Sequence, residues 1–348
     1  MNGNGYSALP YFRRRFDAVA RRSAFSAGSA DQCKAWQRTL RRKLKQLTGY
    51  ETMQPTDPQP QITEQIELDD CFRQHVEIRT EPGVVMTLYV LVPKTGSAPW
   101  PAVIATHGHA SGGKAAVAGD RTHPEVARTI DEHNYDYGRQ FVRQGLIVFC
   151  PDARGFGERQ EPAVANEGVL ASSCRHLNSM AYPLGQTVTG MWTWDLHRLV
   201  DYIRTRPDCR GTRIGCAGLS GGGLQTLWAA ALDPRIGCAV VSGYFYGYKQ
   251  SLLDMYQCSC NYVPHLYEYV DMGDIAALIA PRPLLIETGD SDPLNGAGGL
   301  RNVQPQVAIA RKAYRLLGAQ RQLKHHVFPG PHRWCGQQAL PWMKEHLA

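Results

Sequence analysis

The sequence predicts an α/β protein with a mostly parallel, doubly wound sheet, helices on both faces of it and a helical segment before it. Three observations lead to this prediction: short apolar runs, helical patterns between them, and a G-x-S-x-G turn where one run passes into a helix. Continuous apolar runs are typical of parallel strands that are buried on both faces. Their alternation with helices is typical of doubly wound sheets.

The composition is that of an ordinary globular protein. The chain has 348 residues, of which 43% are hydrophobic and 20% are charged, enough for one large domain or two modest ones. The first residues lack an apolar core of signal-peptide length, and no run approaches the length of a membrane span. We therefore expect a soluble, cytoplasmic protein with no membrane partner.

Residues 1–65 are expected to form a helical N-terminal segment and a Pro-rich linker. Trp36, Leu40, Leu44 and Leu47 form an apolar stripe at helical spacing, and residues 53–61, MQPTDPQPQ, are typical of an extended linker. The formal charge of +7 comes partly from basic residues here. A nucleic-acid-binding arm is one interpretation, but no recognition motif accompanies these charges. A solvated helix face is favoured, with no nucleic-acid partner expected.

Residues 66–348 are expected to form the catalytic domain. Alternating apolar residues predict two antiparallel strands that turn at residues 81–83. The later strands are predicted from apolar runs at residues 101–105, 146–150, 214–217, 238–241 and 284–286. Helices are predicted at residues 125–144, 192–206, 224–232, 303–317 and 337–347. A Tyr-rich insertion at about residues 244–270 interrupts this alternation.

The stretch RIGCAGLSGGGL, residues 213–224, predicts a nucleophile elbow centred on Ser220. In such an elbow a sharp, strained turn between a strand and a helix exposes a serine hydroxyl at the end of a sheet. Gly218 and Gly222 flank the serine, where a Cβ would clash as strand and helix pass close together. Because five-residue matches are common by chance, the prediction depends on finding an acid and a base downstream.

A carboxylate and a histidine follow Ser220 in the chain order that this kind of site requires, serine, then acid, then histidine. Asp290 and Asp292 both come just after the predicted strand 284–286, and Asp292 is favoured as the acid. The alternative is that either aspartate caps a turn. His332, in the loop FPGPHRW, is the predicted general base, because it follows a short strand and precedes the last helix.

An oxyanion site needs two backbone N–H groups, one of them from the residue after the nucleophile. Gly221 is predicted to supply that group. The second is expected from the loop after residues 101–105, with His109 favoured over Gly108. His107 and Gly108 are predicted to contact substrate.

No metal and no cofactor are expected. His107 and His109 are a weak metal signal without nearby carboxylates. Cys258 and Cys260 form a C-x-C pair, which is too short for the usual zinc knuckle and has no second pair nearby. The ten cysteines are expected to be reduced thiols.

The pocket wall is expected to include Tyr244, Tyr246 and Tyr262 of the Tyr-rich insertion, although ordinary packing is nearly as good an interpretation. Asp152 and Arg154, after the predicted strand 146–150, are expected to pair and hold loops together.

With these pieces in order, the chain from about residue 72 onward resembles the α/β-hydrolase superfamily, and more narrowly its dienelactone-hydrolase-like and acetyl xylan esterase-like branch. The matching segments are residues 107–108, 154–158, 194–195, 201–203, 218–222, 280–285, 289–292 and 330–332. The resemblance implies the α/β-hydrolase fold and an esterase with Ser220 as nucleophile, Asp292 as acid and His332 as base. The chain departs from true dienelactone hydrolases, which have cysteine at the elbow, so carboxylic esters such as acetylated sugars are favoured as substrates.

The predicted function is therefore a serine carboxylic-ester hydrolase that acts through an acyl-enzyme on small acyl esters, with acetyl esters favoured. One alternative is a carbohydrate-specific deacetylase or a glucuronoyl-type esterase. Another is a catalytically inactive hydrolase fold that serves as a binding protein. The expected partner is a small-molecule or carbohydrate ester, and the oligomeric state stays open.

Overall fold

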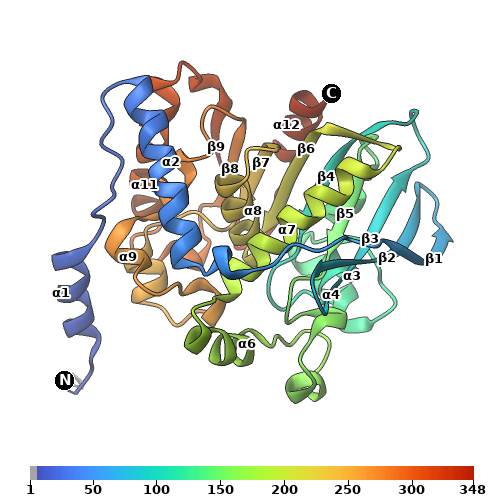
Figure 1. The fold of residues 1–348 in the computed structure, drawn as a ribbon, viewed down its shortest axis with the longest axis horizontal. Coiled ribbons are helices and arrows are strands. Elements are labelled where there is room, and N and C mark those ends of the chain that lie inside the picture. The colour runs from blue at the N-terminus through green and yellow to red at the C-terminus, as the bar shows by residue number, and fades with distance from the viewer. Residues whose placement is uncertain (1–5) are drawn as a thin grey trace.

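A nine-stranded sheet runs through the middle of the molecule, which the computed structural model describes over residues 6–348 (Figure 1). Residues 1–5 of the predicted N-terminal segment lie outside the described residues. The strand order is β1-β2-β3-β5-β4-β6-β7-β8-β9. Strands β1, β2, β3 and β5 pair antiparallel in turn, and every pairing from β5 to β9 is parallel. The strands are β1 Gln61–Glu67, β2 Cys71–Glu81, β3 Val84–Pro93, β4 Trp100–Thr106, β5 Ile147–Pro151, β6 Cys209–Leu219, β7 Ile236–Ser242, β8 Leu284–Gly289 and β9 Leu323–Phe328.

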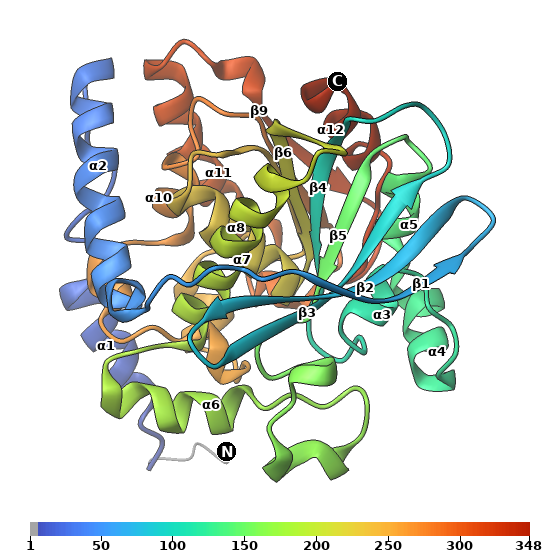
Figure 2. The ribbon, with the colours of Figure 1, turned by 45° about the vertical axis from the view of Figure 1, so that its right-hand side comes forward.

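Helices cover both faces of this sheet, as the sequence predicts. In Figure 2, α7 and α8 lie on one side of β4, β5 and β6, and α5 and α12 lie on the other. None of the helices in residues 6–348 combines the length and the apolar character that crossing a membrane requires. The α-helices are α1 Leu9–Val19, α2 Ala30–Leu47, α3 Lys114–Val117, α4 Pro124–His133, α5 Tyr137–Val142, α6 Cys174–Ala181, α7 Val188–Thr205, α8 Gly221–Leu232, α9 Leu266–Tyr269, α10 Met272–Ala277, α11 Leu300–Leu316 and α12 Ala339–Leu347.

Two apolar cores sandwich the sheet. Along β4, Ala102 and Ile104 belong to the core under α7 and α8, whereas Val103 and Ala105 belong to the core under α5 and α12. Successive side chains of a strand point to opposite faces, so a strand between two cores needs apolar residues at every position. This requirement explains the continuous apolar runs of the sequence.

Two sequence-based expectations about elements were wrong. The structure has three antiparallel strands before β4, because β1 joins the predicted pair. All but one of the residues of β1 are exposed. An exposed edge strand buries no face, so it leaves no alternating apolar pattern to read. The single helix expected over residues 125–144 is divided into α4 and α5. Asn134 ends α4 with a left-handed φ of 55°, a conformation that asparagine tolerates better than most residues.

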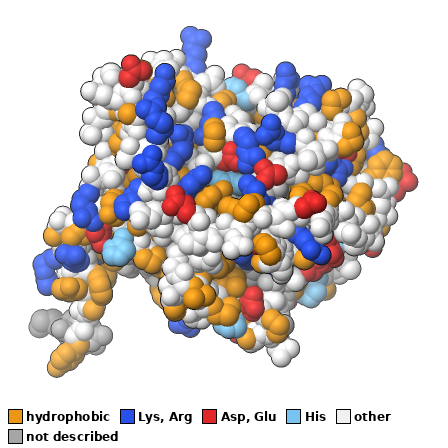
Figure 3. All heavy atoms as spheres, in the orientation of Figure 1, with side chains coloured by type: hydrophobic (Ala, Val, Ile, Leu, Met, Phe, Trp, Pro, Cys, Tyr) orange, Lys and Arg blue, Asp and Glu red, His pale blue; other side chains and the backbone are white. Residues whose placement is uncertain are grey.

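The N-terminal segment docks on the main body through polar contacts as well as apolar ones. The Gln37 side chain in α2 donates to the carbonyl oxygens of Ala277 and Ala280, at 2.8 Å each. Figure 3 shows Lys and Arg side chains gathered along the face on which α2 lies. The expected solvated face is only part of their role, since Arg21 forms an ion pair with the buried Asp274 and Arg41 donates to the carbonyl of Ala231.

A buried ion cluster joins the loop after β5 to α7. Asp195 of α7 accepts from the guanidinium groups of Arg154, at 2.7 Å, and Arg159, at 2.9 Å, and Arg154 also contacts Glu81. The expected pair of Asp152 with Arg154 was therefore wrong. Arg154 is engaged by Asp195 and Glu81, and Asp152 instead accepts from the Lys114 ammonium group at 2.6 Å.

The Asp195 carboxylate is held in its charged form. Burial alone would raise the pKa of Asp195, but the charges of Arg154 and Arg159 outweigh burial and hold that pKa at about 2. The ion pairs therefore stabilise the fold above the ordinary aspartate pKa of about 3.9, and this stabilisation is lost as the pH falls toward 2.

The variant Asp195→Asn should lower the free energy of unfolding at neutral pH by about 3–5 kcal/mol, because it leaves two buried guanidinium groups without their shared partner. Urea denaturation followed by circular dichroism measures the change. The matched control is Asp131→Asn, which removes an exposed ion pair with Arg121 and should change the free energy of unfolding far less. Equal losses in the two variants would contradict the role given to the cluster.

Candidate active site

Ser220 occupies a strained turn between β6 and α8. Its backbone has φ 60° and ψ −121°, a region that residues other than glycine rarely adopt. The turn leaves no room for side chains beside it: a Cβ on Gly222 would lie 2.0 Å from the Thr106 carbonyl oxygen, and one on Gly218 would lie 2.3 Å from Thr106 Oγ1. The Ser220 amide donates to the carbonyl of Ser242 at 2.9 Å, which ties the turn to the end of β7.

His332 and Asp292 meet at the same edge of the sheet. His332 Nδ1 lies 2.7 Å from Asp292 Oδ2, and the Asp292 side chain is almost completely buried. The rival aspartate has another partner, since Asp290 Oδ1 accepts from the Gly330 amide at 3.0 Å and so holds the loop that carries His332. The two carboxylates that the sequence left as alternatives for the acid therefore have different partners.

The His332 ring lies beside the serine turn. A Cβ on Gly243 would lie 2.9 Å from His332 Cε1 and 3.0 Å from Leu219 Cδ1, so the ring, Gly243 and the residue before Ser220 are in close contact. The backbone carbonyl of His332 is hydrogen-bonded to His133 Nδ1 at 3.0 Å. With Nδ1 committed to Asp292, the other ring nitrogen, Nε2, is the one available to a serine hydroxyl.

The loop after β4 lies against the start of α8. A Cβ on Gly108 would be 3.0 Å from the Gly221 nitrogen, and one on Gly221 would be 2.7 Å from His109 Nδ1. The Gly108 amide donates to the Tyr135 hydroxyl at 2.7 Å and is therefore engaged. The amide of Gly221 opens α8, where the first N–H groups have no partner inside the helix.

The predicted substrate-contacting residues are mostly enclosed by protein. His107 is 1% exposed, and its Nδ1 and Nε2 are hydrogen-bonded to the Gly108 carbonyl and the Ala153 amide, which leaves no ring nitrogen for a substrate. Burial also lowers the pKa of His107. Tyr244 and Tyr246 are 4% and 2% exposed, which matches the packing alternative that the sequence left open.

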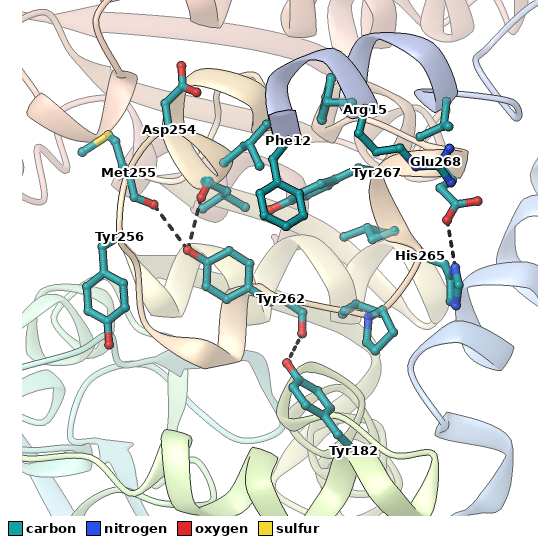
Figure 4. Close-up of a pocket in the computed structure, with 17 residues that line it drawn as sticks. Phe12, Arg15, Tyr182, Asp254, Met255, Tyr256, Tyr262, His265, Tyr267 and Glu268 are labelled. Carbon is teal, nitrogen blue, oxygen red and sulfur yellow. Dashed lines mark hydrogen bonds and ion pairs between the residues drawn. The ribbon is translucent and has the colours of Figure 1, made fainter. Parts of the chain in front are cut away.

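Tyr262 lies at a different place. It lines an apolar groove of about 650 Å³ between α1 and the Tyr-rich insertion, with Phe12 and Tyr267 among its other walls (Figure 4). The Tyr262 hydroxyl is directed to the carbonyl oxygens of Leu252 and Met255, at 3.2 and 3.4 Å. None of the candidate catalytic residues lines this groove, so its size does not make it the catalytic pocket.

Sequence reasoning missed a cluster of side chains beside the Ser220 turn whose sulfur and nitrogen atoms could bind a metal ion. His109, Cys174, Cys258 and Cys260 each offer one ligand atom, and these atoms all lie within 4.8 Å of one another. Only Cys258 and Cys260 are neighbours in the sequence. Cys174 stands alone at the start of α6, and no spacing pattern relates it to the other three.

The strand order and the strand–turn–helix unit at Ser220 show that this protein has the α/β-hydrolase fold. The chain belongs to the Abhydrolase family, whose model matches residues 16–330. A curated relative is "Putative hydrolase YtaP" of Bacillus subtilis (strain 168), which is 31% identical over 228 residues, 63% of this chain and 69% of the relative.

Solved structures share the fold at lower identity. A "putative acetyl xylan esterase" from Bacteroides fragilis NCTC 9343 superposes with a TM-score of 0.76 at 20% identity, covering 93% of this chain and 82% of that one. A glucuronoyl esterase from Solibacter usitatus gives a TM-score of 0.68 at 18% identity, covering 95% and 97% of the two chains. These similarities establish the architecture over nearly the whole chain.

The variant Gly222→Ala should be destabilised, although alanine is the better helix former, because its Cβ would collide with the Thr106 carbonyl. Overpacking of this kind typically costs about 1–3 kcal/mol. Urea unfolding should show this loss. Gly237→Ala is the control, since a Cβ there meets nothing closer than 3.6 Å, and it should be neutral or stabilising. A Gly222 variant as stable as the control would contradict the packing argument.

Proposed function

We propose that this protein is a serine carboxylic-ester hydrolase in which Ser220, His332 and Asp292 act as nucleophile, general base and acid. The observation that carries the proposal is the strained backbone of Ser220 beside a histidine whose Nδ1 is bound to a buried carboxylate. A strained turn persists only where the surrounding structure holds it, and such turns are concentrated at functional sites. Membership of the Abhydrolase family supports the same proposal.

In the proposed acylation, Asp292 keeps the imidazole proton on Nδ1, so His332 Nε2 accepts the proton of the Ser220 hydroxyl. Ser220 Oγ bonds to the ester carbonyl carbon, and the carbonyl oxygen becomes an oxyanion. The imidazolium then gives its proton to the alcohol oxygen as the ester C–O bond breaks. The alcohol leaves, and the acyl group stays on Ser220.

The oxyanion is proposed to accept hydrogen bonds from the amides of Gly221 and His109. The Gly108 amide, which the sequence left as the second choice, already donates to Tyr135, and this favours His109. In the second half of the reaction His332 takes a proton from water, the water oxygen attacks the acyl carbon, and the carboxylic acid leaves as Ser220 recovers its proton.

For the substrate, we propose a small acyl ester, with an acetyl ester first. A carbohydrate ester is the second candidate, since solved structures that share the fold over nearly the whole chain are named as an acetyl xylan esterase and a glucuronoyl esterase. Values of kcat/KM on an aryl acetate, an acetylated xylo-oligosaccharide and a methyl glucuronate separate these candidates. The greatest value identifies the class of substrate.

The variant Ser220→Ala should fold normally and lose about 10⁴-fold or more in kcat on a chromogenic acetyl ester, because no other group forms the acyl-enzyme. A fluorophosphonate probe should label the wild-type protein at Ser220 and leave the variant unlabelled. Near-normal turnover by the variant would refute the mechanism. A wild-type protein that neither turns over esters nor reacts with the probe would favour the inactive binding protein.

The variant Asp292→Asn should lower kcat by about 10⁴-fold, because the amide favours the wrong imidazole tautomer. Asp290→Asn is the matched control: it weakens one exposed hydrogen bond, worth about 1 kcal/mol, to the loop that carries His332. Its effect on kcat should be far smaller. A larger loss in the Asp290 variant would transfer the role of the acid to that residue.

A further inference from the structure

Four metal-binding side chains from three separate segments converge beside the serine turn. His109 comes from the loop after β4, Cys174 from the first position of α6, and Cys258 and Cys260 from the Tyr-rich insertion. Each side chain presents one ligand atom, and all four atoms lie within 4.8 Å of one another. Cys260 Sγ lies 3.2 Å from His109 Nε2, within hydrogen-bond distance. Because these segments are far apart in the sequence, tertiary structure rather than one local motif brings the four side chains together.

We propose that His109, Cys174, Cys258 and Cys260 bind a structural zinc ion. Zn²⁺ takes four ligands in a tetrahedron, and three cysteines with one histidine are a common set. Its bond lengths, about 2.3 Å to sulfur and about 2.0 Å to nitrogen, place the ligand atoms about 3.5–3.8 Å apart. The four atoms are already close to that spacing, so small side-chain rotations complete the site.

A disulfide accounts for less of this arrangement. It would join two of the three sulfurs and leave the third thiol and the His109 nitrogen without a role. Soft thiolate ligands combined with imidazole suit zinc, whereas carboxylates, which Mg²⁺ and Ca²⁺ prefer, are absent from the cluster. Zinc binding displaces the three thiol protons to solvent and leaves the site with a net charge of −1.

Groups around the cluster are arranged to support it. Asn261 Nδ2 lies 3.7 Å from Cys260 Sγ, so it can donate to a thiolate there. The orientation of that amide is fixed, because Asn261 Oδ1 accepts from the Tyr244 hydroxyl at 2.8 Å. The His109 ring packs against Phe156, with ring centroids 5.3 Å apart. Partners of this kind orient the ligands of metal sites and tune their affinity.

Burial favours a closed site rather than a catalytic one. Cys174 and Cys260 are completely buried, while Cys258 and His109 are half-buried and leave a route for the ion to enter. With four protein ligands, zinc has no open position for water or substrate. The ion would therefore act as a cross-link that holds three segments together.

The position of His109 connects this site to the serine turn. With zinc on Nε2 the ring proton is confined to Nδ1, and this nitrogen faces Gly221. Should the proposed esterase mechanism hold, on which this one consequence depends, the zinc would also fix the loop whose His109 amide contacts the oxyanion. The metal site itself does not depend on that mechanism.

The first experiment is a metal analysis of the full chain, produced with zinc in the medium and purified under reducing conditions without a polyhistidine tag. Inductively coupled plasma mass spectrometry should find about one zinc per chain in the wild type and a loss of at least tenfold in Cys260→Ser. Cys209→Ser, a buried cysteine outside the cluster, is the control and should keep the metal. Ser220→Ala should also keep it while losing the proposed activity, which separates the two proposals.

The second experiment uses the wild type, so that it does not depend on how a variant folds. After removal of zinc by a chelator, Co²⁺ should produce the visible bands of tetrahedral coordination and a sulfur-to-cobalt charge-transfer band. Alkylation should spare Cys174, Cys258 and Cys260 in the zinc form and modify them after chelation. Absence of stoichiometric zinc together with absence of the cobalt bands would overturn the proposal, as would a disulfide within the cluster in the reduced protein or equal zinc loss in Cys209→Ser.

Discussion

The close passage of β6 and α8 at Ser220 is the constraint on which the rest of the candidate site depends. The turn is possible only because Gly218 and Gly222 present no side chain to Thr106, at the end of the neighbouring strand β4. The turn is also bonded to β7 through the Ser220 amide. The strained residue is therefore held by the ends of three adjacent strands, and the energy that maintains it comes from the packed sheet rather than from the turn itself.

Around this turn, paired polar groups position several loops at the sheet edge. Asp152 accepts from Lys114, Arg154 is held between Asp195 and Glu81, and Asp290 binds the loop that presents His332. A polar group taken out of water without a partner is costly, so these pairings determine which loop conformations are accessible.

The sequence was sufficient for the features that rest on local patterns. Parallel strands buried on both faces leave continuous apolar runs, and the order of serine, acid and histidine follows the direction of the chain, so the fold and the candidate residues Ser220, Asp292 and His332 could be proposed from it. The exposed edge strand β1 has no such pattern and was missed. The break at Asn134 depends on one left-handed residue within a continuous apolar periodicity.

Features that depend on contacts between distant segments could not be predicted. Asp152 and Arg154 are near neighbours in sequence, which suggested a pair, but tertiary structure gives each a closer partner of opposite charge. Cys174 carries no spacing signal, so its approach to Cys258 and Cys260 is visible only in three dimensions. The same holds for Tyr135, whose hydroxyl engages the Gly108 amide.

Helix α1 is attached to the molecule in a different way from the sheet. None of its residues is fully buried, and it contacts the Tyr-rich insertion through the Phe16 and Tyr267 rings, with centroids 5.5 Å apart, and through two solvent-accessible ion pairs, Arg13 with Asp254 and Asp17 with Lys249. Ions in solution weaken exposed pairs of this kind, whereas the apolar packing beneath the sheet is strengthened by salts such as sulfate. The molecule therefore combines two kinds of contact with opposite responses to salt, and ionic strength weakens only the ion pairs of α1 and not the packing that holds the serine turn.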